Sequence, residues 1–271
     1  MASIRKPTRR GVADRREPWA RAACHGGIEN TNYFVDTDRG AHVLTLFERL
    51  AAASIWTLSN AQLVIEAVAT LAFALSGLIE AARKRLDAVG VCVVAGLAAF
   101  GGGTLRDVLL DRRPFIWVQH AAWLWALLAL CIGAMLFMRA RHVEPTERAT
   151  QWPDAFGLGL FTAGGAQVAL DMSLPAIVAV LMGMVTAVCG GVLRDVVCNE
   201  IPKAFRDHRP YAVCSFAGGW LVVLAHTSGT PQWVGLAIGA GSATLLRALA
   251  LRSGWTLPSW RSMWPDERGR G

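Results

Sequence analysis

The feature that most constrains this sequence is a short motif that occurs twice inside long apolar stretches. The first copy, GGGTLRDV, covers residues 101–108, and the second, GGVLRDV, covers 190–196. An arginine or aspartate within a membrane span costs at least about 3 kcal/mol unless it faces a cavity or a partner. Paired glycines are where such a helix can bend or open. Two such sites in corresponding halves point to a permeation or binding site.

The overall composition indicates an integral membrane protein. The chain is 54% hydrophobic and 17% charged, with a mean hydropathy of +0.37. Its net charge of +7 comes from basic residues in the N-terminal tail, the loops and the C-terminus. This distribution favours membrane orientation over nucleic-acid binding. We therefore predict a lipid bilayer as partner and no nucleic acid.

Seven apolar segments approach the length of about 20 residues that a membrane-spanning helix needs. The sequence predicts an all-α integral membrane protein with seven transmembrane helices. These are expected at 60–82, 88–110, 117–138, 154–171, 174–197, 211–227 and 232–250. Residues 1–57 are predicted to be a disordered basic extension, and residues 251–271 a C-terminal tail.

The two motif copies belong to a longer internal repeat. An offset of 88 residues aligns Arg106 with Arg194 and gives 14 identical pairs among the 49 positions from 66 to 114, without a gap. The units are 58–140 and 141–228, and a seventh helix, 229–250, lies outside them. Because each unit contains three spans, an odd number, the second enters the membrane upside down. The sequence thus predicts two inverted three-helix repeats.

Basic loop residues predict the orientation in the membrane. One set of alternate loops and the C-terminal tail contain most of them, whereas the other loops contain only Arg112 and Arg113. The positive-inside rule then places the N-terminus outside and the C-terminus in the cytoplasm, in the cell inner (plasma) membrane. The richer set is Arg83, Lys84, Arg85, Arg139, Arg141, Arg148, Lys203, Arg206, Arg209, Arg252 and Arg261.

The chemistry of the motif suggests how ions or solutes could be handled. If a helix opens at its glycines, the freed carbonyl groups can coordinate a cation and the freed N–H groups favour an anion. Neighbouring side chains on a helix point about 100° apart. We therefore expect Arg106 to meet Asp195 or a carbonyl group across the axis, or the Arg106–Asp107 and Arg194–Asp195 pairs to tie their helices to neighbours. The alternative is that both pairs are packing locks.

Two further carboxylates, Glu66 and Asp154, fall in the first turns of predicted spans. There they complement the helix dipole, and surface capping is the favoured interpretation over an ion site. The six cysteines have no CxxC or metal-ligand spacing. Nothing resembles a nucleophile with its base, a zinc motif or a phosphate-binding loop. We therefore predict no catalytic residue, no metal and no cofactor, and a protein that is not an enzyme.

Several motifs together resemble a known family. The two GG-x-L-R-D units, FALSG at 73–77, DAFGL at 154–158 and NEIP at 199–202 resemble the prokaryotic TRIC (trimeric intracellular cation) channels, whose bacterial members are often labelled glycine-transporter-domain proteins. The resemblance covers residues 58–250. It implies a homotrimer of seven-helix protomers, each with its own pore for K⁺ and, less selectively, Na⁺.

The same resemblance implies which residues line the pore. The second and fifth helices would bend at their glycines, which are Gly101, Gly102, Gly103, Gly190 and Gly191 in this sequence. Cys189 replaces a third glycine in the second unit, and the N-terminal extension has no counterpart in the family pattern.

Three functions are compatible with these observations. The first is a passive channel for monovalent cations, which the resemblance favours. The second is a small-solute secondary transporter, for example of glycine, whose carboxylate would meet a helix N-terminus or an arginine and whose ammonium would meet carbonyl groups or an aspartate. The third is a structural membrane protein in which the Arg-Asp pairs only lock helices together.

Overall fold

The chain divides into an N-terminal unit, residues 1–57, and a helical unit, residues 58–271. The computed structural model describes residues 3–5, 30–37, 40–47, 60–141, 146–206 and 210–256.

The N-terminal unit contains a three-stranded antiparallel sheet. Its strands are β1 (Ser3–Arg5), β2 (Asn30–Thr37) and β3 (Gly40–Phe47), in the order β1-β2-β3. In the register of β2 and β3, Asn30 is opposite Phe47 and Thr37 is opposite Gly40. β2 is rich in the aromatic and β-branched residues that favour strands. These strands differ from the disorder predicted for 1–57, and the rest of that prediction lies outside the described residues.

The helical unit has a long helix at each of the seven positions that the sequence predicted. The bounds are α2 (Asn60–Arg83), α3 (Ala88–Leu109), α5 (Ala122–Arg141), α6 (Glu147–Asp171), α7 (Ala176–Val197), α9 (Ala212–Thr227) and α10 (Gln232–Ser253). Two short helices, α4 (Ile116–Gln119) and α8 (Lys203–Arg206), lie between them. Within the described residues, α2, α3, α7 and α10 are long and apolar enough to cross a membrane, while α5 and α9 contain shorter apolar stretches.

Two helices begin five or more residues away from their predicted start. The third long helix begins at Ala122 instead of 117, because α4 and a turn after it occupy the residues before it. The fourth begins at Glu147 instead of 154. Its start is fixed by Thr146, whose hydroxyl group accepts a hydrogen bond from the Ala149 N–H at 3.3 Å. This is the usual N-cap interaction of a threonine.

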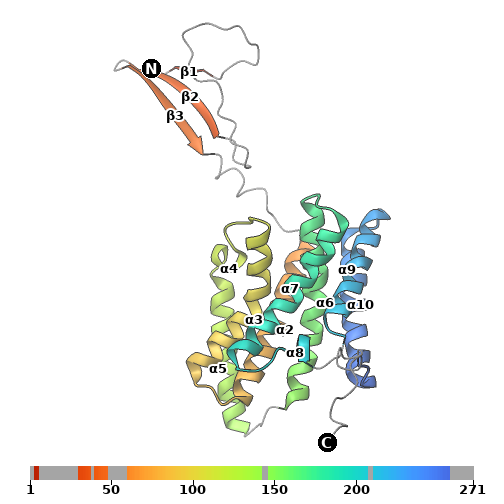
Figure 1. The fold of residues 1–271 in the computed structure, drawn as a ribbon. Helices are drawn as coiled ribbons and strands as arrows, with labels where there is room; N and C mark the ends of the chain where they lie inside the picture. The colour runs from red at the N-terminus through yellow and green to blue at the C-terminus, as the bar shows by residue number, and fades with distance from the viewer. Residues whose placement is uncertain are drawn as a thin grey trace, which may run out of the picture. The chain divides into compact units, whose positions relative to one another are not determined.

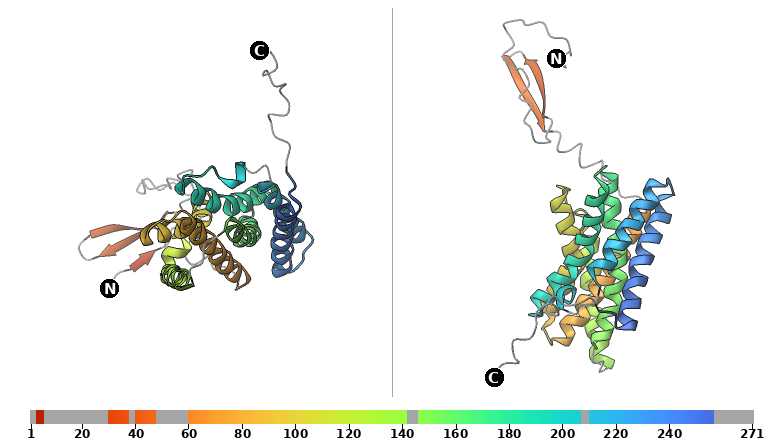
Figure 2. Two further views of the ribbon diagram at one scale, coloured as in Figure 1. Left: turned by 90° about the horizontal axis from the view of Figure 1, so that it is seen from below. Right: turned by 45° about the vertical axis from the view of Figure 1, so that its right-hand side comes forward.

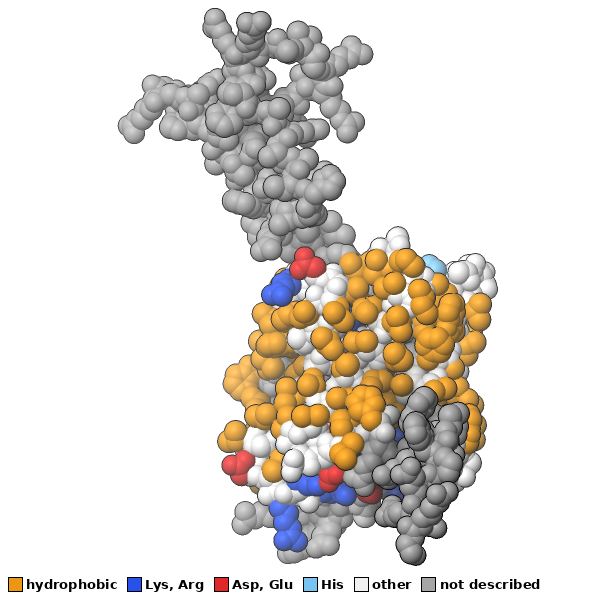
Figure 3. All heavy atoms as spheres, in the orientation of Figure 1, with side chains coloured by type: hydrophobic (Ala, Val, Ile, Leu, Met, Phe, Trp, Pro, Cys, Tyr) orange, Lys and Arg blue, Asp and Glu red, His pale blue; other side chains and the backbone are white. Residues whose placement is uncertain are grey.

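The long helices form a bundle around α6. This helix packs against α2, α7, α9 and α10, and the views in Figures 1 and 2 show it between these neighbours. Small residues fill much of α6, and most of it is buried. Hydrophobic side chains cover most of the visible face of the helical unit, as Figure 3 shows. An apolar surface of this extent suits contact with lipid.

Equivalent residues of the two repeats make reciprocal contacts. A Cβ atom on Gly102 would meet the carbonyl oxygen of Thr186, and one on Gly190 would lie 2.5 Å from the carbonyl oxygen of Ala98. The 88-residue offset exchanges these two contacts. The rings of Phe73 and Phe161, an equivalent pair, stack with centroids 5.4 Å apart. Reciprocal contacts of this kind are what a two-fold axis produces.

The equivalent helices α2 and α6 also run in opposite directions. Gln62 near the start of α2 donates a hydrogen bond to Asp171 at the end of α6. Ser76, two-thirds of the way along α2, donates to the carbonyl oxygen of Thr150 in the first turn of α6, at 3.3 Å. The turns that end the helices match as well. Their left-handed residues form equivalent pairs, Arg85 with Ser173 and Asp111 with Asn199.

Contacts between distant loops place several basic segments at one end of the bundle. Lys84, after α2, forms an ion pair with Glu200, after α7. Arg252 near the end of α10 lies over the ring of Trp152 near the start of α6, at 5.2 Å from its centroid. Because Ser76 of α2 and Arg194 of α7 both contact the first turns of α6, the ends of α2, α7 and α10 lie together with the start of α6.

The close approach of α3 and α7 predicts that an added methyl group is costly at its centre. Gly102→Ala and Gly190→Ala should each lower stability by about 1–3 kcal/mol, because the new Cβ meets backbone that cannot rotate away. Gly133→Ala is the control, since nothing lies within 4 Å of its Cβ position. It should be neutral or slightly stabilising, because alanine favours a helix. The difference in melting temperature is measured by heating the protein in detergent and quantifying the remaining folded protein by size-exclusion chromatography. Equal melting temperatures for Gly190→Ala and Gly133→Ala would contradict the contact.

Candidate functional site: two buried arginine clusters

The first cluster joins α2 to α3 through Arg106, whose exposed fraction is 1%. Its Nε donates a hydrogen bond to Asp107 Oδ1 at 2.9 Å. Its Nη1 and Nη2 donate to the two carboxylate oxygens of Glu66, both at 3.1 Å. This bidentate arrangement is the strongest form of an arginine–carboxylate pair. We call Arg106, Asp107 and Glu66 the Arg106 cluster.

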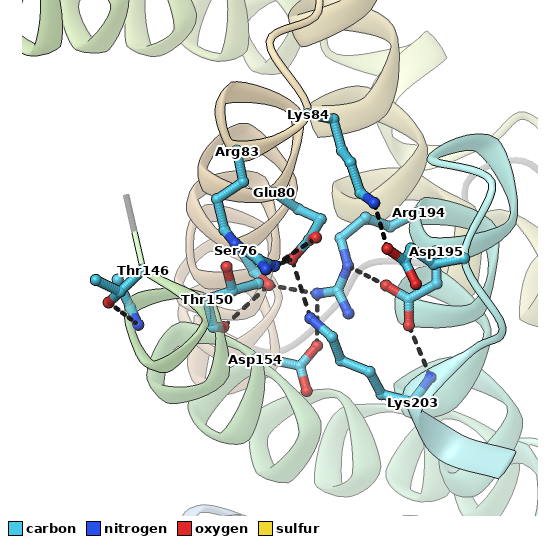
Figure 4. A network of polar contacts seen from close by, with 12 residues as sticks. Ser76, Glu80, Arg83, Lys84, Thr146, Thr150, Asp154, Arg194, Asp195 and Lys203 are labelled. Carbon is cyan, nitrogen blue, oxygen red and sulfur yellow. Dashed lines mark hydrogen bonds and ion pairs between the residues drawn. The ribbon is translucent and has the colours of Figure 1, made fainter. Parts of the chain in front are cut away.

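The second cluster joins α7 to α6 and α2 through Arg194, which is also 1% exposed. Its Nε donates to Asp195 Oδ1 at 2.8 Å, and its Nη1 donates to Asp154 Oδ1 at 2.7 Å. The same Nη1 donates to the hydroxyl group of Ser76. Figure 4 shows the guanidinium group between these three side chains. We call Arg194, Asp195 and Asp154 the Arg194 cluster.

The two clusters are built alike because they occupy equivalent positions in the repeat. In each, the arginine pairs with the aspartate that follows it and with a carboxylate 40 residues earlier. Each guanidinium therefore faces two carboxylates. Burying these groups costs several kcal/mol per ion, which is offset only if the geometry is good and the hydrogen bonds are satisfied. Both clusters meet that condition.

The motif glycines leave room for the cluster carboxylates and for the close contact of α3 and α7. A Cβ on Gly103 would lie 3.3 Å from Glu66 Oε1, and one on Gly191 would lie 3.4 Å from Asp154 Oδ1. These two glycines let each ion pair lie against the helix backbone. Gly101 differs, because its Cβ position lies against the side chain of Leu193 in α7.

The residues around the two clusters are not equivalent. At the Arg106 cluster, Arg112 Nη1 lies 3.4 Å from Asp107 Oδ1. At the Arg194 cluster, Asp195 Oδ2 accepts a hydrogen bond from the backbone N–H of Lys203 at 2.9 Å, while Lys203 Nζ contacts Glu80 at 2.9 Å. The loop after α7 is thus held across this cluster. A small recess there is lined by Val188, Gly191, Val192, Arg194, Asp195, Lys203, Ala204 and Tyr211.

A further arginine, Arg247 of α10, lies next to this recess. It is 2% exposed, and its guanidinium carbon lies 4.7 Å from the ring centroid of Tyr211. In the described part of the chain, its Nε and Nη1 have no hydrogen-bond partner, and neither has the Tyr211 hydroxyl group. Arg247 has no equivalent in the first half, because α10 lies outside the repeat.

The structure decides between the alternatives for the charged residues: each Arg-Asp pair ties its helix to a neighbouring helix, through Glu66 or Asp154. Although neighbouring side chains on a helix point about 100° apart, Arg106 bonds to the adjacent Asp107, because its long side chain turns back and brings Nε to the neighbouring carboxylate. Its other partner is Glu66 of the same repeat, so within the described residues the ion pairs of Arg106 do not cross to Asp195. Glu66 and Asp154 are not surface caps: each is 4% exposed and ion-paired to a buried arginine.

The motif glycines lie within continuous helices. Both α3 and α7 continue as α-helix through Gly101–Gly103 and Gly190–Gly191, so the backbone is not opened there. Sequence reasoning missed Ser76, Tyr211 and Arg247. Ser76 and Tyr211 align with Gly164 and Trp123, so the repeat gave no signal for them. Across the residues that the structure describes, no group of three His, Cys, Asp or Glu side chains could hold a metal ion.

Comparison with known proteins places the chain in a family. The family described as "Glycine transporter" matches residues 63–141 and 151–227, the two repeats. A UPF0126 membrane protein of Vibrio cholerae is 32% identical over 222 residues, covering 80% of this chain and 90% of the relative. The UPF0126 inner membrane protein YadS of Escherichia coli is 33% identical over 211 residues, covering 76% and 98%.

The solved structures agree. The TRIC trimeric intracellular cation channel orthologue from Rhodobacter sphaeroides superposes with a TM-score of 0.68 and 31% identity, covering 73% of this chain and all of that chain. A structure described as the basis for conductance through TRIC cation channels gives a TM-score of 0.64 and 30% identity, covering 72% and 95%. The chain belongs to the TRIC-like glycine-transporter family. It is a multi-pass membrane protein, and these TRIC neighbours are channels rather than enzymes.

The clusters of this TRIC-like protein predict a large cost for removing one arginine. Arg194→Gln leaves Asp154 and Asp195 buried without a cation and should lower stability by about 3–5 kcal/mol. Arg83→Gln, which breaks a partly exposed pair with Glu80, should cost about 1 kcal/mol or less. The double variant Asp154→Asn/Arg194→Gln should recover part of the loss. Unfolding in detergent by increasing SDS measures all three. An Arg194→Gln protein as stable as Arg83→Gln would refute the role of the cluster.

Proposed function

We propose that this protein is a passive channel for monovalent cations, with K⁺ preferred over Na⁺. The observation that carries the proposal is its similarity to solved TRIC cation channels over all or nearly all of their length. The proposed pathway runs between α3 and α7, from one arginine cluster to the other. These helices contact each other and carry both clusters.

The charges of the clusters support cation passage. Taken alone, two arginines beside a pathway would repel cations. In this structure, however, Arg106 faces Glu66 and Asp107, and Arg194 faces two carboxylates in the same way. Each cluster on its own therefore contains one more negative than positive formal charge. The arginines hold the carboxylates in place and do not form a positively charged barrier to cations.

The contact between α3 and α7 accounts for a closed state of such a channel. The backbones of α3 and α7 meet at Gly102 and Gly190, where no side chain separates them. We propose that conduction requires the two helices to move apart at these glycines. Glycine favours this because α3 and α7 have no side chains to disengage there.

The wider assembly is part of the same proposal. Seven membrane-spanning helices, the two inverted repeats plus α10, would place the N-terminus outside and the C-terminus in the cytoplasm of the inner membrane. The basic ends of α2, α7 and α10 lie together, which supports one cytoplasmic face. The Rhodobacter sphaeroides neighbour is described as trimeric, and we propose a homotrimer for this chain as well.

A glycine transporter is the second candidate, because the clusters offer both cationic and anionic groups to a zwitterion. The contacts favour the channel. Arg194 already donates to Asp195, Asp154 and Ser76, and Arg106 already donates to Glu66 and Asp107. A solute carboxylate would have to displace one of these partners.

Purified protein in liposomes distinguishes the two functions. With opposed gradients of K⁺ and glycine, we expect K⁺ efflux that follows the membrane potential and does not saturate across about a tenfold range of K⁺. The reason is that a conducting pore binds each ion only weakly, so that the ion leaves readily. Protein-free liposomes are the control. Saturable glycine uptake without K⁺ efflux would reject the channel and establish the transporter.

A further inference from the structure

Arg247 is a buried positive charge that belongs to neither arginine cluster. Its exposed fraction is 2%, and its Nε and Nη1 lack hydrogen-bond partners among the described residues. Arg106 and Arg194, in contrast, each contact two carboxylates. A buried charge without an adjacent counter-ion repels nearby cations strongly, because a protein interior screens the Coulomb interaction far less than water does.

Arg247 lies close to the Arg194 cluster. Its guanidinium group stacks on the ring of Tyr211, and Tyr211 lines the recess beside Arg194. Two oxygen atoms lie close to the Cβ position of Gly191: the Tyr211 hydroxyl oxygen at 3.2 Å and Asp154 Oδ1 at 3.4 Å. Arg247 therefore packs against a ring that borders the Arg194 cluster, which is one end of the proposed pathway. A cation–π contact of this kind fixes the guanidinium group without neutralising it.

Among the described residues, no such charge lies beside the Arg106 cluster. The extra arginine at the Arg106 cluster, Arg112, lies 3.4 Å from Asp107 and is therefore paired with a carboxylate. Lys203 at the Arg194 cluster is likewise paired, with Glu80. Of these three additional cations, Arg247 alone contacts an aromatic ring instead of a carboxylate among the described residues. The seventh helix thus adds a charge to one end of an otherwise two-fold arrangement.

We propose that Arg247 is a specificity-determining residue that makes the pathway prefer monovalent over divalent cations. This inference rests on the proposed channel function. The Coulomb energy between a fixed charge and a passing ion is proportional to the charge of the ion. A barrier that slows K⁺ tenfold therefore slows a divalent cation of similar size a hundredfold. Removal of the Arg247 charge should accordingly increase divalent flux much more than K⁺ flux.

The test compares K⁺ and Ba²⁺ fluxes through the full-length protein in liposomes, because the two ions have similar radii. Arg247→Met removes the charge and keeps an apolar side chain of similar length. Arg247→Gln removes the charge and keeps a polar one, so at least one variant is expected to fold. Arg247→Lys keeps the charge. Arg252→Gln, on the same helix, removes an exposed arginine that lies over Trp152 and is the matched control.

We expect Arg247→Met and Arg247→Gln to raise the Ba²⁺/K⁺ flux ratio about tenfold. Arg247→Lys and Arg252→Gln should keep the wild-type ratio. A charge-removing variant that carries K⁺ with an unchanged ratio would overturn this inference and leave the channel intact. So would an Arg247→Lys variant that changes the ratio as much as Arg247→Met does, since the effect would then come from shape. A wild-type protein without K⁺ flux would instead overturn the proposed function.

Discussion

The structure depends on two arginines that are buried in an apolar bundle and are each held by two carboxylates. At 1% exposure, burying the charges of Arg106 and Arg194 would cost several kcal/mol each without the carboxylates of Glu66, Asp107, Asp154 and Asp195. These pairs also determine which helices lie together, because each arginine joins its own helix to the first helix of the same repeat. The glycines follow from the same requirement, since a side chain at 103 or 191 would crowd the carboxylate.

The internal two-fold relation explains most of the fold, and its exceptions identify where the two ends differ. Helix bounds, turns and ion pairs repeat at an offset of 88 residues, down to the left-handed residues that end equivalent helices. Ser76, Tyr211 and Arg247 break this relation, and all three lie at the Arg194 cluster. If both ends were identical, neither could treat ions differently. Of these three residues, Arg247 comes from the seventh helix, which lies outside the repeat.

The sequence predicted the positions of the long helices, the repeat and the buried Arg-Asp pairs because each has a local signal in hydropathy or identity. It did not predict the partners of the arginines. Glu66 and Asp154 are 40 residues away in the chain, and near the start of a span a carboxylate is indistinguishable from a helix cap. A signal was nevertheless present, since both repeats carry an acid at this position. Tyr211 and Arg247 had no repeated counterpart, so only the packing of α9 and α10 could bring them to the site.

The central claim is that α3 and α7 must separate for ions to pass, and a reversible cross-link tests it most directly. A Cβ on Gly101 would lie 4.0 Å from Leu193 Cβ, within the range of a disulfide. In a background without the native cysteines, Gly101→Cys/Leu193→Cys should lose K⁺ flux when oxidised and regain it when reduced, whereas each single variant should respond to neither treatment. A fully cross-linked protein that conducts K⁺ as fast as its reduced form would contradict the account.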